Sequence, residues 1–292
     1  MFMPSPQRIV IPTPLLAFNW LAGGGIASGD VVSVVGEKSS GRTALLLTIL
    51  ANAQKSNLVA AYIDCEDEFQ STMARQCGVD DNLIYAKAQS SEEALDVAKS
   101  LINSGSVDIL AIDKMYSLLS SNSALDAADV FRKNLKHLAN IARERHVALI
   151  FSLPYVPMPE NSDAPVEWWA LNIGAEDHRI CLRHPRYAND TLFCDVHIYS
   201  KYVRYQQINS SVAFIPCAYQ TSWELFSLAA SCTIIHYESG VYIYNTTHLA
   251  TSPEQCIDII NKDKTLFEQL LNDVQIEFKS RCLKLKHRDL LL

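Results

Sequence analysis

The chain has 292 residues, of which 49% are hydrophobic and 20% are charged, and its formal net charge is −7 at pH 7. This composition is ordinary for a globular protein, and the length allows one large domain or a core with a smaller second domain. No stretch approaches the ~18 unbroken apolar residues that a membrane helix needs. The proline-broken start, MFMPSPQRIVIPTPLL, does not fit a secretory signal, so we expect a cytoplasmic protein.

Neither the charge nor the cysteines indicate a function by themselves. The acidic net charge does not indicate nucleic-acid binding, although a local basic groove matters more than the sum. Basic residues gather at 178–186 and 279–288, where they either contact phosphates or form a solvated face. The eight cysteines include no C-x-x-C pair, which argues against a zinc site and a disulfide framework.

The first half of the chain alternates apolar runs with segments of helical periodicity. The apolar runs, expected to be strands, are 31–35, 58–66, 83–88, 107–113 and 147–153. The expected helices between them are 44–55, 71–78, 91–105, which opens on a Ser91 cap and closes on Gly105, and 123–146. Continuous apolar strands that alternate with helices predict an α/β fold, with a mainly parallel central sheet flanked by helices.

The second half changes its rhythm. Further strands are expected at 179–184, 191–202 and 212–219. From about Thr221 a helix, a Tyr-rich hairpin at 236–245 and two further helical stretches follow. We therefore predict a core over residues 1–217 and a small C-terminal α+β domain over residues 218–292.

Residues 36–43, GEKSSGRT, nearly match the phosphate-binding pattern G-x-x-x-x-G-K-[ST]. They lie between an expected strand and an expected helix, where backbone N–H groups converge on phosphates. The predicted nucleotide-binding residues are Gly36, Glu37, Lys38, Ser39, Ser40, Gly41, Arg42 and Thr43. The alternative is a strand–helix turn that binds no ligand.

Arg42 stands where the pattern has lysine. Its longer, planar guanidinium keeps the charge but does not place a compact ammonium at the bridging oxygen. Phosphoryl transfer depends almost wholly on positioning and electrostatics, so we expect binding to survive better than hydrolysis. Lys38 is a candidate for a replacement amine.

Acidic residues end two of the expected strands, where ligands of parallel sheets bind. Asp113 can hold Mg²⁺ through water, with the Thr43 hydroxyl as a further ligand. Asp64, Glu66, Asp67 and Glu68 end the other strand. A carboxylate there can position an attacking water, and Glu66 is the candidate; solvation of the strand end explains Asp67 and Glu68 equally well.

The order of these pieces resembles the bacterial RecA recombinase family, from about Ile9 to the 270s. The blocks concerned are LAGGGIASGDVVSVVGEKSSGRT, AAYIDCEDEFQSTMARQCGVDDNLI, VDILAIDKMYSLL and SGVYIYN. The resemblance implies a RecA-like P-loop NTPase core that binds ATP and Mg²⁺, with a small C-terminal domain. It places the catalytic glutamate on Glu66 and the Walker B aspartate on Asp113.

The sequence also departs from that family. Met73 falls where an aromatic residue flanks the adenine, and Pro154 falls where a glutamine senses the γ-phosphate. Proline has no side-chain donor, so that relay is expected to be missing. The segment between Asp113 and Asp126 is short for the first DNA loop, and no N-terminal docking helix is expected.

The second DNA loop, roughly residues 154–173, lacks Gly-rich and basic character. Its Trp168 and Trp169 are candidates for stacking on unpaired bases, a protein contact or core packing being the alternatives. Arg179 and Arg183 are further DNA-binding candidates. Lys201 and Arg204 fall near the positions whose cations reach a neighbour's nucleotide.

These observations favour a divergent RecA-family protein that binds ATP and acts in recombination or repair as an accessory or regulator. At most it is a weak DNA-dependent ATPase. Its partners would be single-stranded DNA, a full recombinase or another repair protein, and its oligomeric state stays open. The alternatives are an active filament-forming recombinase, a nucleotide-independent scaffold, and an unrelated P-loop transferase.

Overall fold

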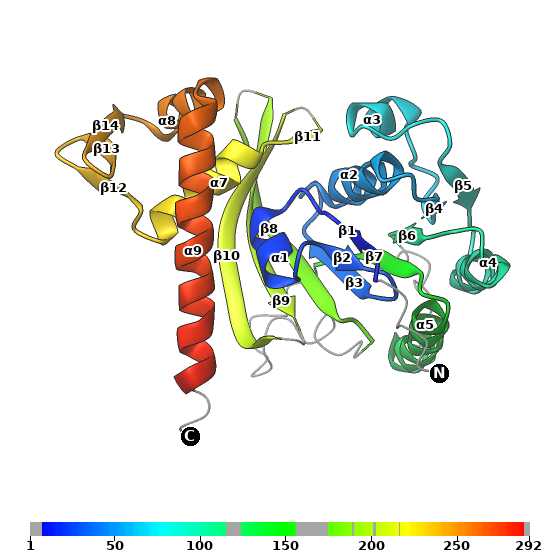
Figure 1. Cartoon of the computed structure of the whole chain (residues 1–292). Coiled ribbons are helices and arrows are strands. Elements are labelled where there is room, and N and C mark those ends of the chain that lie inside the picture. The colour runs from blue at the N-terminus through cyan, green and yellow to red at the C-terminus, as the bar shows by residue number, and fades with distance from the viewer. Residues whose placement is uncertain are drawn as a thin grey trace.

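A nine-stranded sheet organises the molecule (Figure 1). The computed structural model describes residues 8–114, 124–155, 175–188, 190–200, 203–215 and 217–288. The strand order in the sheet is β11-β10-β9-β8-β3-β7-β6-β4-β5. The strands are β3 (Val31–Gly36), β4 (Ala60–Asp64), β5 (Ile84–Lys87), β6 (Ile109–Asp113), β7 (Ala148–Pro154), β8 (His178–Ala188), β9 (Thr191–Ser200), β10 (Val203–Ile215) and β11 (Ala218–Tyr219).

The strands β8, β3, β7, β6, β4 and β5 pair in parallel with their neighbours. On the other side of β8, the strands β9, β10 and β11 follow in that order and pair antiparallel. This arrangement confirms the expected mainly parallel sheet. All the carboxyl ends of the parallel strands therefore meet at one edge, which is where ligands of open α/β sheets bind.

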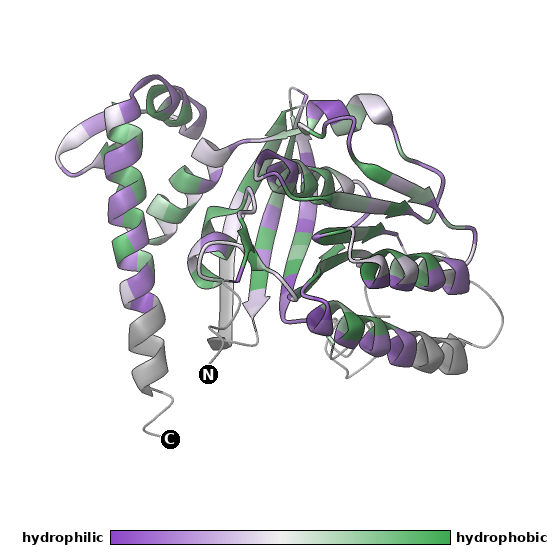
Figure 2. Ribbon diagram, turned by 45° about the vertical axis from the view of Figure 1, so that its right-hand side comes forward, coloured by the Kyte–Doolittle hydropathy of each residue, from purple (hydrophilic) through white to green (hydrophobic). Residues whose placement is uncertain are grey.

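Helices cover both faces of the parallel region. They are α2 (Arg42–Lys55), α3 (Ser71–Gln76), α4 (Ser91–Ser104) and α5 (Ala124–Glu144). Side chains of β3 alternate between two buried clusters: Val32 and Val34 join the cluster of α2, whereas Val31 and Val35 join that of α4 and α5. In Figure 2 the strands are mostly hydrophobic, whereas the helices beside them are striped. The continuous apolar runs of the sequence thus reflect burial on both faces.

The structure moves the start of α4 by one residue. The expected cap was Ser91, but Ser90 is the N-cap, and its hydroxyl accepts the backbone N–H of Glu93 at 3.1 Å. Glu93 in turn accepts the backbone N–H of Gln89 at 2.7 Å. A serine three residues before a glutamate is the capping-box pattern, but here Glu93 accepts the N–H of Gln89, one residue before the Ser90 cap.

The N-terminal part contains elements that the sequence pattern did not predict. They are β1 (Val10–Ile11), α1 (Leu16–Leu21) and β2 (Ile26–Ala27). Each is too short for a periodic signal. The helix α1 is held instead by a distant carboxylate, since Glu224 accepts the backbone N–H groups of Leu16 at 2.6 Å and Ala17 at 3.2 Å.

The C-terminal part begins with α7 (Thr221–Ser231), which packs on β10. A three-stranded antiparallel sheet follows, made of β12 (Ile235–Glu238), β13 (Val241–Tyr244) and β14 (Thr247–Ala250). The helices α8 (Pro253–Lys262) and α9 (Lys264–Arg288) close the chain, and α9 forms the long column beside the sheet in Figure 1. The expected hairpin is present, while a domain boundary between residues 217 and 218 stays a prediction.

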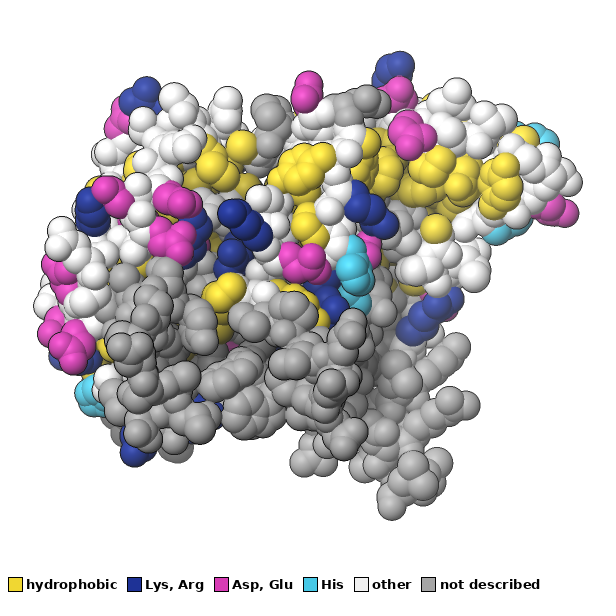
Figure 3. Space-filling view, turned by 180° about the vertical axis from the view of Figure 1, so that it is seen from behind, with side chains coloured by type: hydrophobic (Ala, Val, Ile, Leu, Met, Phe, Trp, Pro, Cys, Tyr) yellow, Lys and Arg dark blue, Asp and Glu magenta, His cyan; other side chains and the backbone are white. Residues whose placement is uncertain are grey.

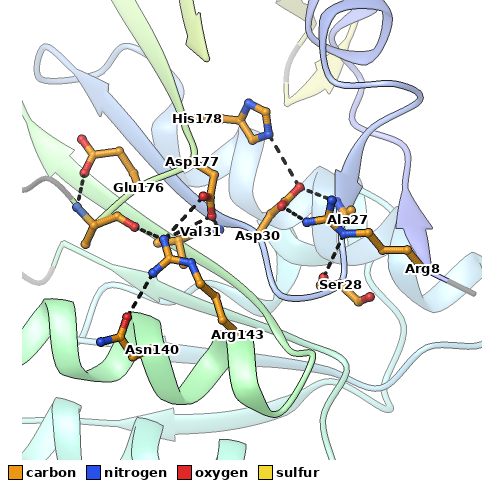
Figure 4. A network of polar contacts seen from close by, with 11 residues as sticks. Arg8, Ala27, Ser28, Asp30, Val31, Asn140, Arg143, Glu176, Asp177 and His178 are labelled. Atoms are coloured by element: carbon orange, nitrogen blue, oxygen red, sulfur yellow. Dashed lines mark hydrogen bonds and ion pairs between the residues drawn. The ribbon is translucent and has the colours of Figure 1, made fainter. Parts of the chain in front are cut away.

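A network of charged side chains fixes the starts of β3 and β8, at the edge opposite the strand carboxyl ends (Figure 4). Asp177 accepts the backbone N–H of Val31 at 2.8 Å and pairs with Arg143 at 3.3 Å. Asp30 pairs with Arg8 and lies 3.6 Å from His178 Nε2. Burial opposes the charge of Asp30, but these partners outweigh it and lower its pKa. The network anchors β3, whose other end leads into the loop 36–43.

Among the described helices, none combines the length and the hydrophobicity that crossing a membrane requires.

Candidate nucleotide-binding site

The loop 36–43 lies at the carboxyl edge of the parallel strands. The strand β3 ends at Gly36, which pairs with Pro154 on β7 and Leu182 on β8, and α2 begins at Arg42. The loop therefore joins a central strand to a helix N-terminus, as the sequence predicts.

A cavity of about 890 Å³ opens over this loop. Residues 38–44 form one wall of it, and the ends of β4, β6 and β7 form another with Glu66, Glu68, Lys114, Pro154 and Tyr155. Leu192, Phe214 and Cys217 line the side of the antiparallel strands. Met73, at the position that the resemblance assigns to the adenine, lines the same cavity.

An added Cβ would crowd neighbouring atoms at both loop glycines. A Cβ atom on Gly36 would lie 2.3 Å from Ser40 Oγ and 3.0 Å from the carbonyl oxygen of Leu182. Gly41 has φ +85°, and a Cβ there would lie 3.2 Å from both Leu192 and Phe214. The tight wrap of the loop thus depends on these two residues.

The described part of the loop leaves polar groups that suit a phosphate. Ser40 is buried, and its hydroxyl has no hydrogen-bond partner among the described atoms. The first turn of α2 has no side-chain cap, because its N-cap is Gly41. Buried hydroxyls and helix N-terminal N–H groups ordinarily have partners, and phosphate oxygens would supply them here.

Asp113 is surrounded by hydroxyl donors. Its carboxylate accepts Thr43 Oγ1 and Tyr62 OH, both at 2.7 Å, and also Ser152 Oγ. Burial, together with the charge of Asp113, raises the pKa of Tyr62, so this phenol stays a donor. The adjacent oxygens of Thr43 and Asp113 are the hard ligands that Mg²⁺ prefers, so the predicted metal-binding pair is brought together.

Arg42 extends into the cavity from the first residue of α2. Burial lowers the pKa of its guanidinium, whereas the charges of Asp113 and Glu66 act in the opposite sense. An arginine stays charged in proteins, so this side chain presents a partly desolvated cation to the cavity.

The acidic end of β4 divides into structural and cavity-facing residues. Asp64 accepts the backbone N–H groups of Glu66 at 3.1 Å and Phe69 at 2.9 Å, so it holds the turn. Asp67 pairs with Lys87 at 2.5 Å. Glu66 and Glu68 instead line the cavity.

Lys114 belongs to this site but was not predicted from the sequence. Its Nζ lies 3.0 Å from Glu66 Oε2 and also contacts Glu68. The sequence pattern at the strand ends selected carboxylates as candidates, and Lys114 is a cation that follows one of these carboxylates, Asp113. Its position one residue after Asp113 was the available signal.

The candidate DNA-binding residues are distributed differently. Trp168 and Trp169 lie outside the described residues, as does Lys201, and the side chain of Arg204 is also outside the description. Arg179 is only 6% exposed and pairs with Glu176, so this conformation offers no open guanidinium face to DNA. Arg183 stacks 4.4 Å above the Tyr155 ring and donates to its hydroxyl at 2.9 Å.

On the face seen from behind, basic and acidic side chains lie interspersed over the coloured part of the surface (Figure 3). That part of the surface shows no continuous basic stripe. DNA binding through Arg179 or Arg183 therefore stays a prediction.

Comparisons with known proteins find similarity over the part of the chain that carries the loop 36–43. The family model described as the RecA N-terminal domain matches residues 7–136. Protein RecA of Bifidobacterium longum is 45% identical over 118 residues, which cover 40% of this chain and 30% of that protein. Protein RecA of Roseiflexus castenholzii is 41% identical over 112 residues, covering 38% and 32%. Protein RecA of Aquifex aeolicus is 35% identical over 156 residues, covering 50% and 45%. The matches thus span about a third to a half of these relatives' lengths.

Proposed function

We propose that this chain binds ATP with Mg²⁺ in the cavity over residues 36–43, because residues 7–136 match the model of the RecA N-terminal domain. We further propose that it acts in DNA recombination or repair as an accessory or regulatory protein with little ATP hydrolysis, in the cytoplasm. The observation that carries this proposal is the loop itself. Its two glycines leave no room for a Cβ, and its buried Ser40 hydroxyl lacks a partner among the described atoms.

The residues divide the binding between them. Loop N–H groups and the Ser40 hydroxyl would hold the phosphates, with Arg42 neutralising their charge. Thr43 and Asp113 would hold the ion, which when bound neutralises phosphate oxygens and fixes their geometry. Met73 would cover one side of the base.

Slow hydrolysis follows from how the remaining groups are placed. Phosphoryl transfer needs an accurately positioned cation and a water-positioning group. The forked Arg42 replaces a compact ammonium, and the Glu66 carboxylate is paired with Lys114. Pro154, beside Gly36, has no side-chain donor with which to report a terminal phosphate.

An active recombinase is the second candidate, because Glu66 lines the nucleotide cavity where a water-positioning carboxylate is needed. Single-stranded DNA, a full recombinase or another repair protein are the proposed partners. A nucleotide-independent scaffold would leave the orphan hydroxyl of Ser40 unexplained.

Calorimetry with ATP and Mg²⁺, followed by phosphate-release assays with and without single-stranded DNA, tests the proposal. We expect saturable binding and an increase in melting temperature, because a ligand of the native state stabilises it by mass action. We expect no DNA-stimulated phosphate release. Vigorous DNA-stimulated release would refute the accessory role in favour of the recombinase, and absence of any binding would favour the scaffold.

Arg42→Lys tests the cause of slow turnover. We expect phosphate release to rise by less than about tenfold, a barrier change below about 1.4 kcal/mol, because Glu66 and Pro154 are unchanged. Arg75→Lys is the matched control, since Arg75 pairs with Asp81 outside the cavity. If Arg42→Lys alone restored robust hydrolysis, the other departures would have little effect.

A further inference from the structure

The ammonium group of Lys114 lies at the wall of the proposed nucleotide cavity. It lines the same cavity as Arg42 and Thr43, and its side chain is only 20% exposed. The ammonium lies between two carboxylates, 3.0 Å from Glu66 Oε2 and in contact with Glu68. A cation placed this way is ordered at the cavity rather than free to sample solvent.

The backbone fixes this placement. Lys114 has φ +58°, in the left-handed region that a lysine rarely adopts. Its N–H donates to Ser152 Oγ at 2.8 Å, and Ser152 also donates to Asp113. A strained residue persists only where its surroundings hold it, and such residues concentrate at functional sites. The hydrogen bond to Ser152 thus holds the backbone of Lys114 in this unusual conformation.

The loop needs a compact ammonium that position 42 does not provide. Arg42 is planar and forked, and the charges of Asp113 and Glu66 oppose the lowering of its pKa by burial. Lys114 approaches Glu66 from the end of β6, and Arg42 lines the same cavity. A flexible four-carbon stem lets an ammonium exchange partners within a few ångströms.

We propose that Lys114 binds the terminal phosphate of a nucleoside triphosphate, supplying from the end of β6 the ammonium that the loop lacks at position 42. This role rests on the proposed nucleotide binding. A terminal phosphate competes with Glu66 and Glu68 for the ammonium, and the exchange makes the site discriminate triphosphates from diphosphates.

The test measures ATP and ADP affinities by calorimetry for the wild-type chain and for Lys114→Met, which keeps the stem and removes the charge. We expect ATP binding to weaken by about tenfold or more and ADP binding by less than about threefold, as for the loss of one charge-assisted contact. Lys87→Met is the control, because Lys87 ends β5, which β4 separates from β6, and pairs with Asp67 outside the cavity. Melting temperatures without nucleotide establish that each variant folds.

Weaker ATP binding could also arise because Glu66 and Glu68 lose their counter-charge. The pair Glu66→Gln and Glu68→Gln therefore accompanies the test, alone and combined with Lys114→Met. We expect the glutamine pair alone to tighten ATP binding, and the triple variant to remain at least about tenfold weaker than that pair, a coupling that a mutant cycle isolates.

Equal ATP affinity in the triple variant and the glutamine pair would overturn the direct phosphate contact, as would unchanged ATP affinity in Lys114→Met. Both outcomes leave the proposed nucleotide binding intact. A wild-type chain that binds neither ATP nor ADP would overturn the proposed function and this role with it.

Discussion

At the scale of single residues, the loop depends on positions where even a methyl group does not fit. Gly41 has φ +85°, and an added Cβ would lie 3.2 Å from Leu192 and Phe214, so a side chain there is both strained and crowded. Gly105, at the end of α4, has φ +69° but nothing within 4 Å of an added Cβ. The two glycines separate the cost of conformation from the cost of contact.

Gly41→Ala should therefore destabilise the chain more than Gly105→Ala. The left-handed conformation alone costs about 1–2 kcal/mol for an alanine, which is the expected loss at Gly105. Gly41→Ala should exceed that loss and weaken ATP binding, because the loop must shift to admit the methyl group. Denaturant unfolding and ATP calorimetry on both variants provide the measurement. Equal losses in stability, with nucleotide binding retained, would show that the contacts yield easily.

The sequence predicted the site residues that belong to a recognisable pattern. Gly36, Gly41 and Thr43 have fixed spacing, and Asp113 ends an apolar strand, so each could be placed without coordinates. Tyr62 and Ser152 could not, because they converge on Asp113 from neighbouring strands. Such convergence depends on strand order, which no local pattern specifies.

At the scale of elements, periodic segments were predictable and short ones were not. The helix α5 and the strand β6 follow their apolar spacing to within a few residues. The helix α1 has only six residues and is capped by a carboxylate from α7, more than 200 residues away in sequence. A contact between residues so far apart in the sequence cannot be predicted from local spacing.

The cap of α4 is a measurable element-scale prediction. Ser90→Ala should lower the free energy of unfolding by about 1 kcal/mol, the usual loss when an N-cap hydroxyl is removed. Ser91→Ala, one residue inside the helix, should change it by less than about 0.5 kcal/mol. Urea unfolding of the two variants measures both losses. A larger loss of stability for Ser91→Ala than for Ser90→Ala would show that Ser91 is the N-cap, as expected from the sequence.

At the scale of the whole molecule, Glu224 ties the C-terminal helices to the start of the chain. It is fully buried on α7 and accepts hydrogen bonds from Leu16, Ala17 and Ser210 as well as Tyr219. Burial raises the pKa of this carboxyl, although its hydrogen bonds oppose the shift. Ionisation of the Glu224 carboxyl is therefore expected to lower the stability of the folded chain.

The sign of the pH dependence follows from that shift. A carboxyl with a raised folded-state pKa binds more protons in the folded than in the unfolded chain. Its contribution to stability is thus fully present below the unfolded pKa of about 4.3 and is lost as the pH rises through the folded pKa.

Glu224→Gln should remove this dependence. The free energy of unfolding of the variant, minus that of the wild-type chain, should become more positive as the pH rises above about 4.3. Denaturant titrations at matched pH values measure that difference. Glu254→Gln, at an exposed position in the first turn of α8, is the control and should leave the slope unchanged. A flat difference for Glu224→Gln would contradict the raised pKa.

The loop 36–43 is contacted by residues from the second half of the chain. Tyr187 donates to the carbonyl oxygen of Ser39 at 2.9 Å, Cys194 lies 3.2 Å from that of Ser40, and Phe214 packs under Gly41. The family match ends at residue 136, before any of these supports. The segment that matches the family model therefore does not contain all the residues that hold this loop in place. If the proposed nucleotide binding holds, substitutions in β8, β9 and β10 can therefore change the affinity while residues 36–43 stay unchanged.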